Sequence, residues 1–283
     1  MRRWIATLLA AMLVVTMLAG CKSAPANNGD GDKQAGTDNS QTQDNSLQAI
    51  KDQGYFTLGF DEDFPPMGFK EDGEYTGFDI EVARELFKRL DIELRLQPIN
   101  WDAKVMELNS HNVDCLWNGM TITEDLKKEV LFSDPYLNNE QVIAVMQDSP
   151  VQSLADLAGK KLGIQAGSSA NVALDDHADF KASLGEVVSF KDNMTALLDL
   201  ESGGLDAVLL DSIVAGYNIT ASGKPFRVLS DSLADEEYGI AFRKEDKALR
   251  DAVQEELNAM AKDGTLAQIS TKWFAKDITT VGK

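Results

Sequence analysis

The sequence predicts an α/β protein with two lobes, each built around a parallel-rich β-sheet that is covered by helices. Short apolar segments with strand periodicity alternate with segments of helical periodicity, as expected for βαβ units. The length of 283 residues fits two domains of about 150 residues each or one large domain. Residues 108–115 also match residues 200–207, and each copy contains a helix end, a tight turn, an aspartate and a buried strand. These observations favour two lobes with one common plan.

Periodicity places the elements of the first half of the folded region. Residues 55–60 form a short apolar run that predicts a buried strand, and residues 92–97 alternate as a half-buried strand does. Between them, apolar residues over 80–90 recur at helical spacing, with Asp79 placed to cap the helix and a turn at residues 71–73 before it. The other elements expected in this half are one helix and two strands, at residues 103–110, 113–117 and 141–146.

The second half continues the alternation of strands and helices. The expected strands are residues 161–165, 206–210 and 226–229. The expected helices are one that opens near Ala170, residues 195–201, residues 212–222, a long amphipathic helix over 248–262 that ends before Gly264, and a last helix that ends at residues 273–274.

The amino terminus has the features of a secretory signal peptide. Two arginines precede an uncharged segment over residues 4–20. This segment leads into Leu-Ala-Gly-Cys at residues 18–21, which resembles the lipobox at which bacterial prolipoproteins are lipidated on cysteine and cleaved before it. We therefore expect residues 1–20 to be removed and Cys21 to carry a lipid that holds the protein at the extracytoplasmic face of the cell membrane. The alternative is an uncleaved anchor helix with an incidental cysteine.

The segment after Cys21 predicts a flexible tether. Residues 22–46 contain no Val, Ile, Leu, Met, Phe, Trp or Tyr, so they cannot bury a core. Residues 28–32 superficially resemble a calcium loop but lack its terminal bidentate glutamate. With Cys21 acylated, Cys115 has no disulfide partner, and we expect it to be a buried small hydrophobe.

The charge balance excludes several function classes. The chain has 27 Lys and Arg against 46 Asp and Glu, a net charge of −19, which disfavours binding to nucleic acid and docking on anionic lipid through a basic face. Two cysteines and two histidines make a disulfide scaffold and a His-rich metal site improbable. The sequence has no Gly-x-Ser-x-Gly, Walker, His-Glu-x-x-His or Cys-x-x-Cys motif. We therefore expect no metal, no cofactor and no enzymatic activity.

Short motifs occur in a fixed order along the folded region. They lie at residues 60–66, 75–79, 119–123, 132–136, 154–161, 165–169, 238–241, 263–265 and 272–274. From about Leu47 to Phe274, this order resembles the amino-acid-binding proteins of ABC importers. The resemblance implies a two-lobed, periplasmic-binding-protein-like fold of type II, with the ligand in a cleft between lobes that two hinge segments connect.

The resemblance also implies the domain organisation and the partners. With crossings near residues 141–145 and 238–242, the chain divides as follows: a first lobe of residues 47–141 plus 238–274, a second lobe of residues 142–237, and a tail of residues 275–283. We expect a monomer that captures an amino acid or a related small polar solute by closure of the lobes. It would deliver this ligand to the permease subunits of an ABC importer.

A free amino acid presents an ammonium and a carboxylate, and burying either group without a partner is expensive. Asp211 directly follows the strand over 206–210, at the edge where open α/β sheets place ligands. The ammonium-binding aspartate of the resembled family falls on this position; the alternative is a helix cap. For the carboxylate, Ser168 and Ser169 follow another strand and open a helix, which makes an anion site. The alternative role of these serines is capping alone.

Further candidates lie in the first lobe. Asn118, Gly119 and Thr121 form the corresponding polar turn, with a capping role as the alternative for Thr121. The resemblance implies that Phe64 stacks on the ligand and that Trp101 lines the cleft, although an isolated aromatic residue is more often part of a core. Asp61, beside Phe64, is expected to reach a distal group of the ligand, with a solvated loop carboxylate as the alternative.

One departure from the family pattern concerns the carboxylate. The resembled family carries an arginine three residues beyond Thr123, but this chain has Leu126 there. Lys127 is about 100° further around a helix and cannot make the same fork without rearrangement. We therefore predict a preference for ligands of positive or zero net charge. The alternative is that position 126 points away from the cleft and that a shifted Lys127 or an ordered water replaces the arginine.

A cyclic-carboxylate dehydratase on the same fold is the alternative function, and it would need arginines in the cleft. A detached sensor domain is a third possibility, disfavoured because no transmembrane or signalling segment follows.

Overall fold

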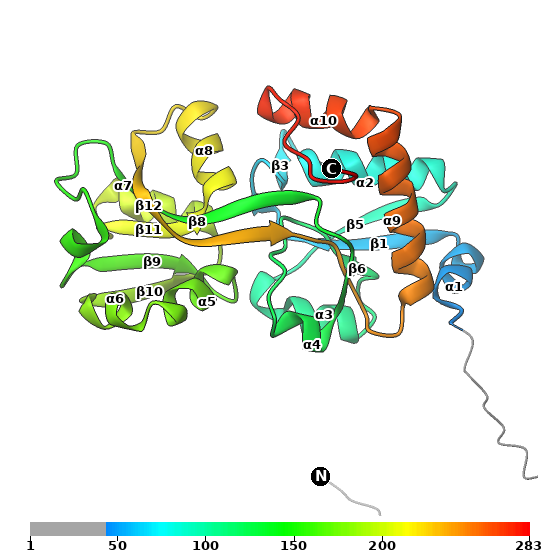
Figure 1. Ribbon diagram of the computed structural model, residues 1–283, viewed down its shortest axis with the longest axis horizontal. Coiled ribbons are helices and arrows are strands. Elements are labelled where there is room, and N and C mark those ends of the chain that lie inside the picture. The colour runs from blue at the N-terminus through cyan, green and yellow to red at the C-terminus, as the bar shows by residue number, and fades with distance from the viewer. Residues whose placement is uncertain (1–43) are drawn as a thin grey trace, which may run out of the picture. The chain divides into compact units, whose positions relative to one another are not determined.

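The computed structural model describes residues 44–283 of the chain (Figure 1). The predicted signal peptide, the predicted lipidation site Cys21 and nearly all of the predicted tether fall outside these residues. Within residues 44–283, no helix combines the length and the apolar character that spanning a bilayer requires. Helices and strands alternate through the described residues, which confirms the α/β class predicted from the sequence.

The first lobe is organised around a five-stranded sheet with the strand order β5-β1-β6-β13-β7 (Figure 1). Its strands are β1 (Tyr55–Phe60), β5 (Glu93–Pro98), β6 (Cys115–Leu116), β7 (Leu131–Phe132) and β13 (Ala241–Phe242). β1 is parallel to β5 and β6, whereas β13 is antiparallel to β6 and β7. The loops that follow β1 and β6 therefore emerge at the same edge of the sheet. Cys115 in β6 is free and fully buried, as predicted.

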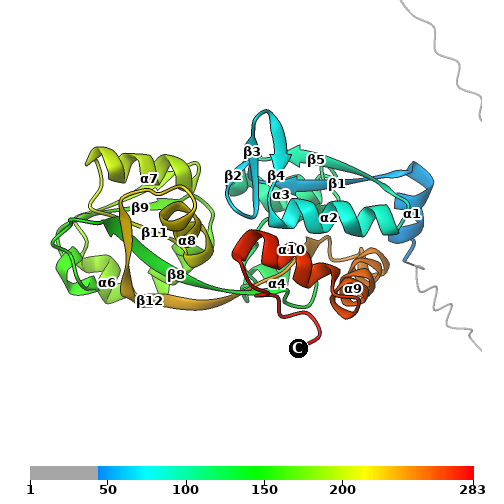
Figure 2. The same ribbon diagram turned by 90° about the horizontal axis from the view of Figure 1, so that it is seen from above.

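The remaining elements of the first lobe surround this sheet. Its helices are α1 (Ser46–Gln53), α2 (Phe78–Arg89), η1 (Trp101–Ala103), α3 (Lys104–Asn109), α4 (Leu126–Glu129), α9 (Lys247–Lys262) and α10 (Thr265–Phe274). A separate three-stranded antiparallel sheet contains β2 (Asp63–Phe64), β3 (Gly68–Glu71) and β4 (Glu74–Thr76). In Figure 2 this small sheet lies on the side of the first lobe that is next to the second lobe, where the ring of Phe69 lies 6.0 Å from the ring of Tyr217.

The second lobe has its own five-stranded sheet, in the order β10-β9-β11-β8-β12. The strands are β8 (Leu137–Met146), β9 (Lys161–Gln165), β10 (Glu186–Phe190), β11 (Ala207–Asp211) and β12 (Phe226–Tyr238). The helices are η2 (Leu154–Leu157), α5 (Ser169–Asp176), α6 (Ala178–Ser183), α7 (Asn193–Ser202) and α8 (Ser212–Thr220). β9 is parallel to β10 and β11, so the loops after β9 and β11 also emerge at one edge.

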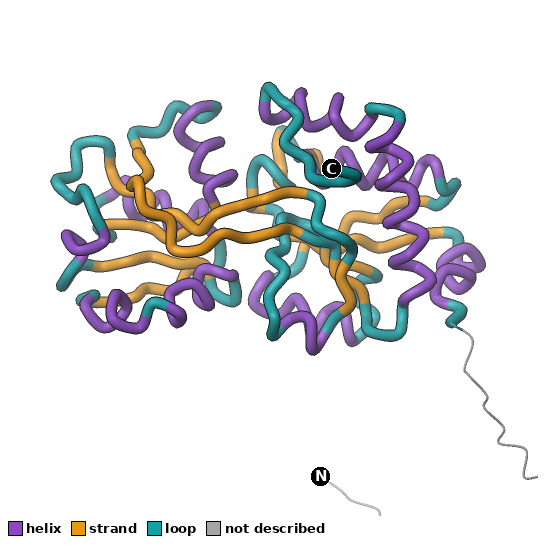
Figure 3. Tube along the Cα trace, viewed as in Figure 1, coloured by secondary structure: helices purple, strands orange, loops and turns teal. Residues whose placement is uncertain are grey.

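Two long antiparallel strands connect the lobes. β8 and β12 pair from Phe226 opposite Met146 to Tyr238 opposite Leu137, and Figure 3 shows them side by side across the middle of the molecule. β11 pairs with residues 141–144 of β8, so the preceding residues extend toward the first lobe. Both crossings therefore lie a few residues earlier than the motifs predicted. The strand predicted over 226–229 continues to Tyr238 because main-chain pairing with β8 carries a polar sequence through the crossing.

The prediction that Asp79 caps a helix was wrong. α2 begins at Phe78 after Gly77, and Asp79 lies within its first turn with its side chain fully buried. One carboxylate oxygen accepts hydrogen bonds from the Gly119 amide at 2.7 Å and from the Tyr136 hydroxyl at 2.9 Å. Asp79 therefore ties α2 to the loop after β6 instead of satisfying the amides of its own helix.

Candidate functional site

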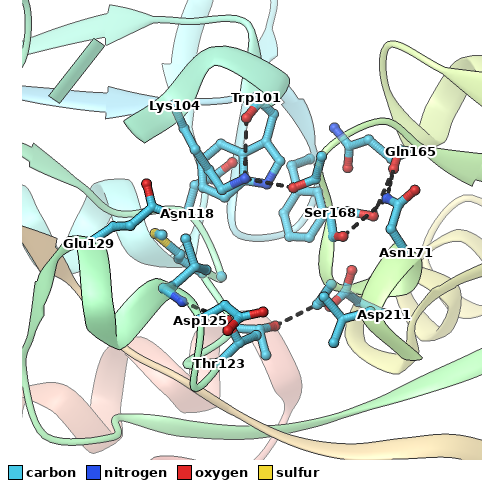
Figure 4. Close-up of a pocket in the computed structure, with 18 residues that line it drawn as sticks. Trp101, Lys104, Asn118, Thr123, Asp125, Glu129, Gln165, Ser168, Asn171 and Asp211 are labelled. Carbon is cyan, nitrogen blue, oxygen red and sulfur yellow. Dashed lines mark hydrogen bonds between the residues drawn. The ribbon is translucent and has the colours of Figure 1, made fainter. Parts of the chain in front are cut away.

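A cavity of about 250 Å³ lies between the two lobes (Figure 4). Its lining includes eight of the nine predicted ligand-binding residues: Phe64, Trp101, Asn118, Gly119, Thr121, Ser168, Ser169 and Asp211. The fold explains this convergence, because Asn118 and Gly119 follow β6, the two serines follow β9, and Asp211 ends β11. The carboxyl edges of the two sheets thus face the same space, as open α/β sheets commonly arrange.

Asp211 supplies a buried carboxylate to the cavity. Its side chain is 4% exposed, and its Oδ1 accepts hydrogen bonds from Tyr238 Oη at 2.7 Å, Asn139 Nδ2 at 2.6 Å and Gln141 Nε2 at 3.1 Å. Burial, together with the nearby charge of Glu236, raises the pKa of Asp211 to about 7. The side chain makes no capping hydrogen bond to α8. The geometry therefore does not support the helix-cap alternative for Asp211.

The amino end of α5 presents backbone donors to the cavity. The Ser168 hydroxyl donates to the Gln165 carbonyl at 2.9 Å and makes no capping bond to the helix. The amides of Ser169 and Ala170 belong to the first turn, where an α-helix offers no carbonyl partner. A carboxylate placed here would meet these amides and the positive end of the helix dipole.

Three hydrogen bonds join the first lobe to residues 165–169 of the second lobe around the cavity. The Thr121 hydroxyl donates to Ser169 Oγ at 3.1 Å, and Lys104 Nζ donates to the Gly167 carbonyl at 2.6 Å. Gln165 Nε2 donates to Asp61 Oδ2 at 2.7 Å. These bonds hold the two lobes together over the cavity, so this structure shows the lobes closed on each other.

Phe64 and Gly119 form part of the first-lobe wall. Gly119 has φ +55°, and a Cβ on it would lie 2.9 Å from Phe64 Cε1 and 3.0 Å from Tyr238 Cε2. Glycine therefore permits both rings to approach the loop after β6. The neighbouring Asn118 accepts a hydrogen bond from the Asp61 amide through Oδ1 at 3.1 Å, which joins the loops after β6 and β1.

Asp61 lies outside the cavity lining, so the structure does not place it for direct contact with a distal group of the ligand. It is 5% exposed and not a solvated loop residue, and burial is the main cause that raises the pKa of its carboxyl to about 6. Its Oδ2 accepts from Gln165, which does line the cavity. Asp61 thus acts on the cavity wall through Gln165.

Sequence reasoning missed several residues of the site. Lys104 lines the cavity and is 8% exposed, and burial lowers the pKa of its ammonium to about 8. Gln165 ends β9, and its place at the strand end could have identified it. Asn139, Gln141 and Glu236 lie on the crossing strands and contact Asp211 or Thr121; no local motif marks them.

Position 126 faces the cavity. Leu126 lines it, so the side chain that replaces the expected arginine leaves an apolar wall at this point. Lys127 does not line this cavity and instead forms an ion pair with Glu124 at 2.7 Å. Within residues 44–283, no group of three or more His, Cys, Asp or Glu side chains is arranged to hold a metal ion.

The chain is similar in sequence to known solute-binding proteins. The family model of bacterial extracellular solute-binding proteins, family 3, matches residues 56–276. The chain is 31% identical over 236 residues to the L-cystine-binding protein TcyJ of Escherichia coli, covering 82% of this chain and 87% of that protein. It is 30% identical over 277 residues to the arginine-binding extracellular protein ArtP of Bacillus subtilis, covering 97% and 98%.

A solved structure shows the same architecture with a ligand. An ABC uptake transporter substrate-binding protein from Streptococcus pneumoniae, solved with bound histidine, superposes with a TM-score of 0.81. The sequences are 35% identical, and the superposition covers 84% of this chain and 99% of that one.

Proposed function

Because the chain belongs to family 3 of the bacterial extracellular solute-binding proteins, we propose that its cavity captures a free amino acid of neutral or positive charge for an ABC importer. The observation that carries this proposal is the buried carboxylate of Asp211, which faces a cavity whose lining also contains residues at the amino end of α5. A carboxylate and a set of free amides are the partners that an ammonium and a carboxylate require.

The ligands named for the similar proteins share this chemistry. Cystine, arginine and histidine each carry an α-ammonium and an α-carboxylate, and none has a net negative charge at neutral pH. In this chain three carboxylates line the cavity against one lysine. An excess of negative charge in a partly enclosed cavity favours cations over anions. These features support neutral and basic amino acids over glutamate and aspartate.

Capture would proceed by closure of the two lobes. The crossing strands β8 and β12 are the connection about which the lobes would open, and the three interlobe hydrogen bonds would form as they close. Closure removes the ligand from water, which strengthens each charged contact in the cavity. The closed protein would then deliver its ligand to the permease subunits in the membrane.

We do not expect the cavity to catalyse turnover. A dehydratase that acts on cyclic carboxylates would need arginines to hold those carboxylates, and the cavity lining contains no arginine among the residues that the structure describes. The three similar proteins are named as binding proteins. Incubation with shikimate-pathway acids tests this point, and product formation would overturn the binding function in favour of the dehydratase.

The membrane anchor is a separate part of the proposal. The run Leu-Ala-Gly-Cys at residues 18–21 supports a lipid on Cys21 that holds the protein at the extracytoplasmic face of the cell membrane. We expect the wild-type protein in the membrane fraction and the Cys21→Ser variant to remain unprocessed. Wild-type protein that is wholly soluble, with residues 1–20 still attached, would contradict this proposal.

Thermal unfolding with a panel of ligands tests the binding function. A ligand that binds only the folded protein raises its stability, by about 2.7 kcal/mol at a concentration of 100 times Kd. We expect L-arginine, L-histidine, L-lysine, L-glutamine or L-cystine to raise the melting temperature, and L-glutamate and L-aspartate to raise it less. A panel in which no amino acid changes the melting temperature or gives heat in calorimetry would overturn the function.

A further inference from the structure

Lys104 is a buried cation that forms no ion pair with a carboxylate of the described residues. Its side chain is 8% exposed, and its Nζ donates to the Gly167 carbonyl at 2.6 Å and, more weakly, to the Trp101 carbonyl at 3.4 Å. Within residues 44–283 no ion pair joins Lys104 to an acidic side chain. An ammonium has three N–H donors, so one remains beyond these two neutral acceptors. Figure 4 shows the Lys104 amine beside Trp101 at the wall of the cavity.

Burying an ammonium against neutral carbonyls is costly. Burial lowers the pKa of Lys104 to about 8, which reflects this cost, although the charges of Asp102 and Glu129 act in the opposite direction. The ring of Trp101, whose centroid lies 5.3 Å from Lys104 Nζ, belongs to a hydrophobic cluster that also includes Val105 and Leu126. A charge that is retained at such a cost, inside a cavity, points to a role in binding.

Lys104 is also the one cationic side chain among the described residues that line the cavity. Leu126 occupies the position where the family pattern places an arginine, and it lines the cavity as an apolar residue. Lys127 faces another groove, paired with Glu124. A carboxylate that enters this cavity can therefore meet a positive side chain only at Lys104.

Lys104 lies close to the amide donors at the amino end of α5 in the second lobe. Its Nζ bonds the carbonyl of Gly167, which lies two residues before the first residue of α5, Ser169. The amides of Ser169 and Ala170 have no intrahelical partners, and Ser168 does not cap them. A carboxylate seated on the amino end of α5 would lie beside the remaining N–H of Lys104.

We propose that Lys104 holds the α-carboxylate of the ligand against the amino end of α5, in the role that an arginine at position 126 would otherwise have. This inference rests on the proposed function, since it assigns a residue of the same cavity to one group of the amino acid. The positive charge that binds the carboxylate would thus lie at the start of α3 in this chain, and not at the start of α4. Because an ammonium binds as a point charge and not as a planar fork, it requires the amides of α5 to fix the carboxylate's orientation.

The test compares acids with their carboxamides, which keep the α-ammonium and the side chain but lose the carboxylate charge. Wild type, Lys104→Met and Lys104→Gln are titrated calorimetrically with L-arginine, L-histidine and L-glutamine, and with the amide of each. We expect wild type to prefer the acid by about 10- to 100-fold, as hydrogen bonds between charged partners contribute. Both variants should bind acid and amide about equally.

Further variants separate binding from closure. Lys104→Gln keeps donors for Gly167 but has no charge, so it retains the interlobe contact while losing the preference for the acid. Lys104→Met combined with Leu126→Arg should restore the preference, because position 126 faces the same cavity. Lys127→Met, which removes a lysine from outside the cavity, is the matched control and should leave the preference unchanged.

The outcomes distinguish this inference from the proposed function. If wild type binds one of the three acids and the Lys104 variants weaken acid and amide equally, Lys104 only joins the lobes and the inference is overturned, while the function stands. If wild type binds no amino acid at all, the proposed function fails, and the inference fails with it. Loss of the acid preference in both variants, with its recovery in the double variant, supports the inference.

Discussion

Asp211 and Glu236 accept hydrogen bonds from the same two side-chain amides. Asn139 Nδ2 lies 2.6 Å from Asp211 Oδ1 and 2.8 Å from Glu236 Oε2, and Gln141 Nε2 lies 3.1 Å and 3.0 Å from the same two oxygens. Two carboxylates held this close favour protonation of one of them or the arrival of a cation. The Thr121 hydroxyl also donates to Glu236, at 3.0 Å, so the pair spans the junction between the lobes.

The first prediction concerns the charge of Asp211. Asp211→Asn keeps the shape of the side chain but leaves a buried ligand ammonium without its counter-charge, which costs about 3–5 kcal/mol, or 100-fold and more in affinity. Asp192→Asn is the matched control: Asp192 is also buried in the second lobe, but it caps α7 through the Thr195 amide and lies outside the cavity lining. Calorimetry should show a large loss for the first variant only, and a loss below about fivefold would contradict the assignment.

The second prediction is a pH dependence of binding. Because the pKa of Asp211 is raised to about 7, the ligand-free carboxyl holds a proton below this pH and must release it to pair with an ammonium. Affinity should therefore fall as the pH is lowered from about 7.5 to 5.5, by at most about tenfold per pH unit. Titrations at about pH 6 in two buffers of different ionisation enthalpy should report proton release upon binding.

Glu236→Gln provides the internal test of this pH dependence. The charge of Glu236 is one cause of the raised pKa of Asp211, so its removal lowers that pKa and moves the loss of affinity to lower pH. Gln keeps an oxygen that can accept from Asn139, which preserves part of the local geometry. An affinity that is constant over this pH range, or a profile that Glu236→Gln leaves in place, would contradict the assignment.

Local sequence patterns predicted several of the strands and the site residues that follow them. β1 and β9 have the predicted bounds, because each is an apolar run with turn signals on both sides. The positions of Ser168 and Asp211 followed from the same local information, since both come directly after such strands and parallel strands bring their carboxyl ends to one edge. The family pattern added Thr121 and the aromatic residues, which no strand end marks.

Other site residues depend on contacts that are distant in sequence. Lys104 lies in a helical segment where a lysine reads as exposed, and its burial depends on Gly167, which belongs to the other lobe. Asp79 has the position of a helix cap, but Gly119 and Tyr136 turn its carboxylate into the core. Glu236 lies in the polar half of β12, which forms a strand only through its pairing with β8. Tertiary packing therefore determines where the side chains of Lys104, Asp79 and Glu236 lie.

The third prediction concerns the close contact at Gly119. Gly119→Ala adds a methyl group 2.9 Å from Phe64 Cε1, at a φ of +55° that non-glycine residues rarely adopt. We expect a loss of about 1–3 kcal/mol in the free energy of unfolding, together with weaker ligand binding, because Phe64 must move. Gly216→Ala is the control: this glycine lies within α8 with open space around it, so alanine should be neutral or stabilising. Equal melting temperatures for the two variants would contradict the prediction.

The fourth prediction is a pH dependence of stability that arises from Asp79. Its pKa is raised from 3.8 to about 7 by burial, so between these pH values the folded chain keeps a proton that the unfolded chain has lost. The contribution of Asp79 to the free energy of unfolding therefore falls as the pH rises through this window. Asp79→Asn carries no charge, and its stability relative to wild type should increase by about 4 kcal/mol between pH 4 and 8, since each unit of pKa difference corresponds to about 1.4 kcal/mol.

Asp156→Asn is the control for Asp79→Asn, and its stability relative to wild type should change with pH in the opposite direction. Hydrogen bonds from the Gln152 amide and from Ser153 lower the pKa of Asp156, so its charged form stabilises the folded chain. The stability of Asp156→Asn relative to wild type should therefore decrease as the pH rises from the lowered folded pKa to the unfolded value of 3.8, and it should be nearly constant between pH 4 and 8. Denaturant unfolding measures both variants at each pH. A relative stability of Asp79→Asn that does not change with pH would show that Asp79 is ionised in the folded protein.

The last prediction concerns the charge of the ligand. Among the residues that the structure describes, Asp125, Glu129 and Asp211 line the cavity against the single cation Lys104, so the local field favours a ligand of positive or zero net charge. In direct titrations at low salt, arginine, lysine, histidine or glutamine should bind at least about tenfold more tightly than glutamate or aspartate. Asp125 and Glu129 are exposed at the wall of the first lobe, whereas Asp211 is buried.

Because of this difference in exposure, the preference for basic over acidic amino acids has one contribution that salt screens and one that it does not. Water and salt screen the charges of Asp125 and Glu129, so Glu129→Gln should reduce the preference for basic over acidic amino acids by roughly two- to fivefold at low ionic strength and less at about 0.15 M. The contribution of Asp211 is buried and should persist at both salt concentrations. If glutamate or aspartate binds more tightly than the basic amino acids at either salt concentration, the excess of carboxylates does not set the selectivity, and the amides of α5 with Lys104 dominate the cavity.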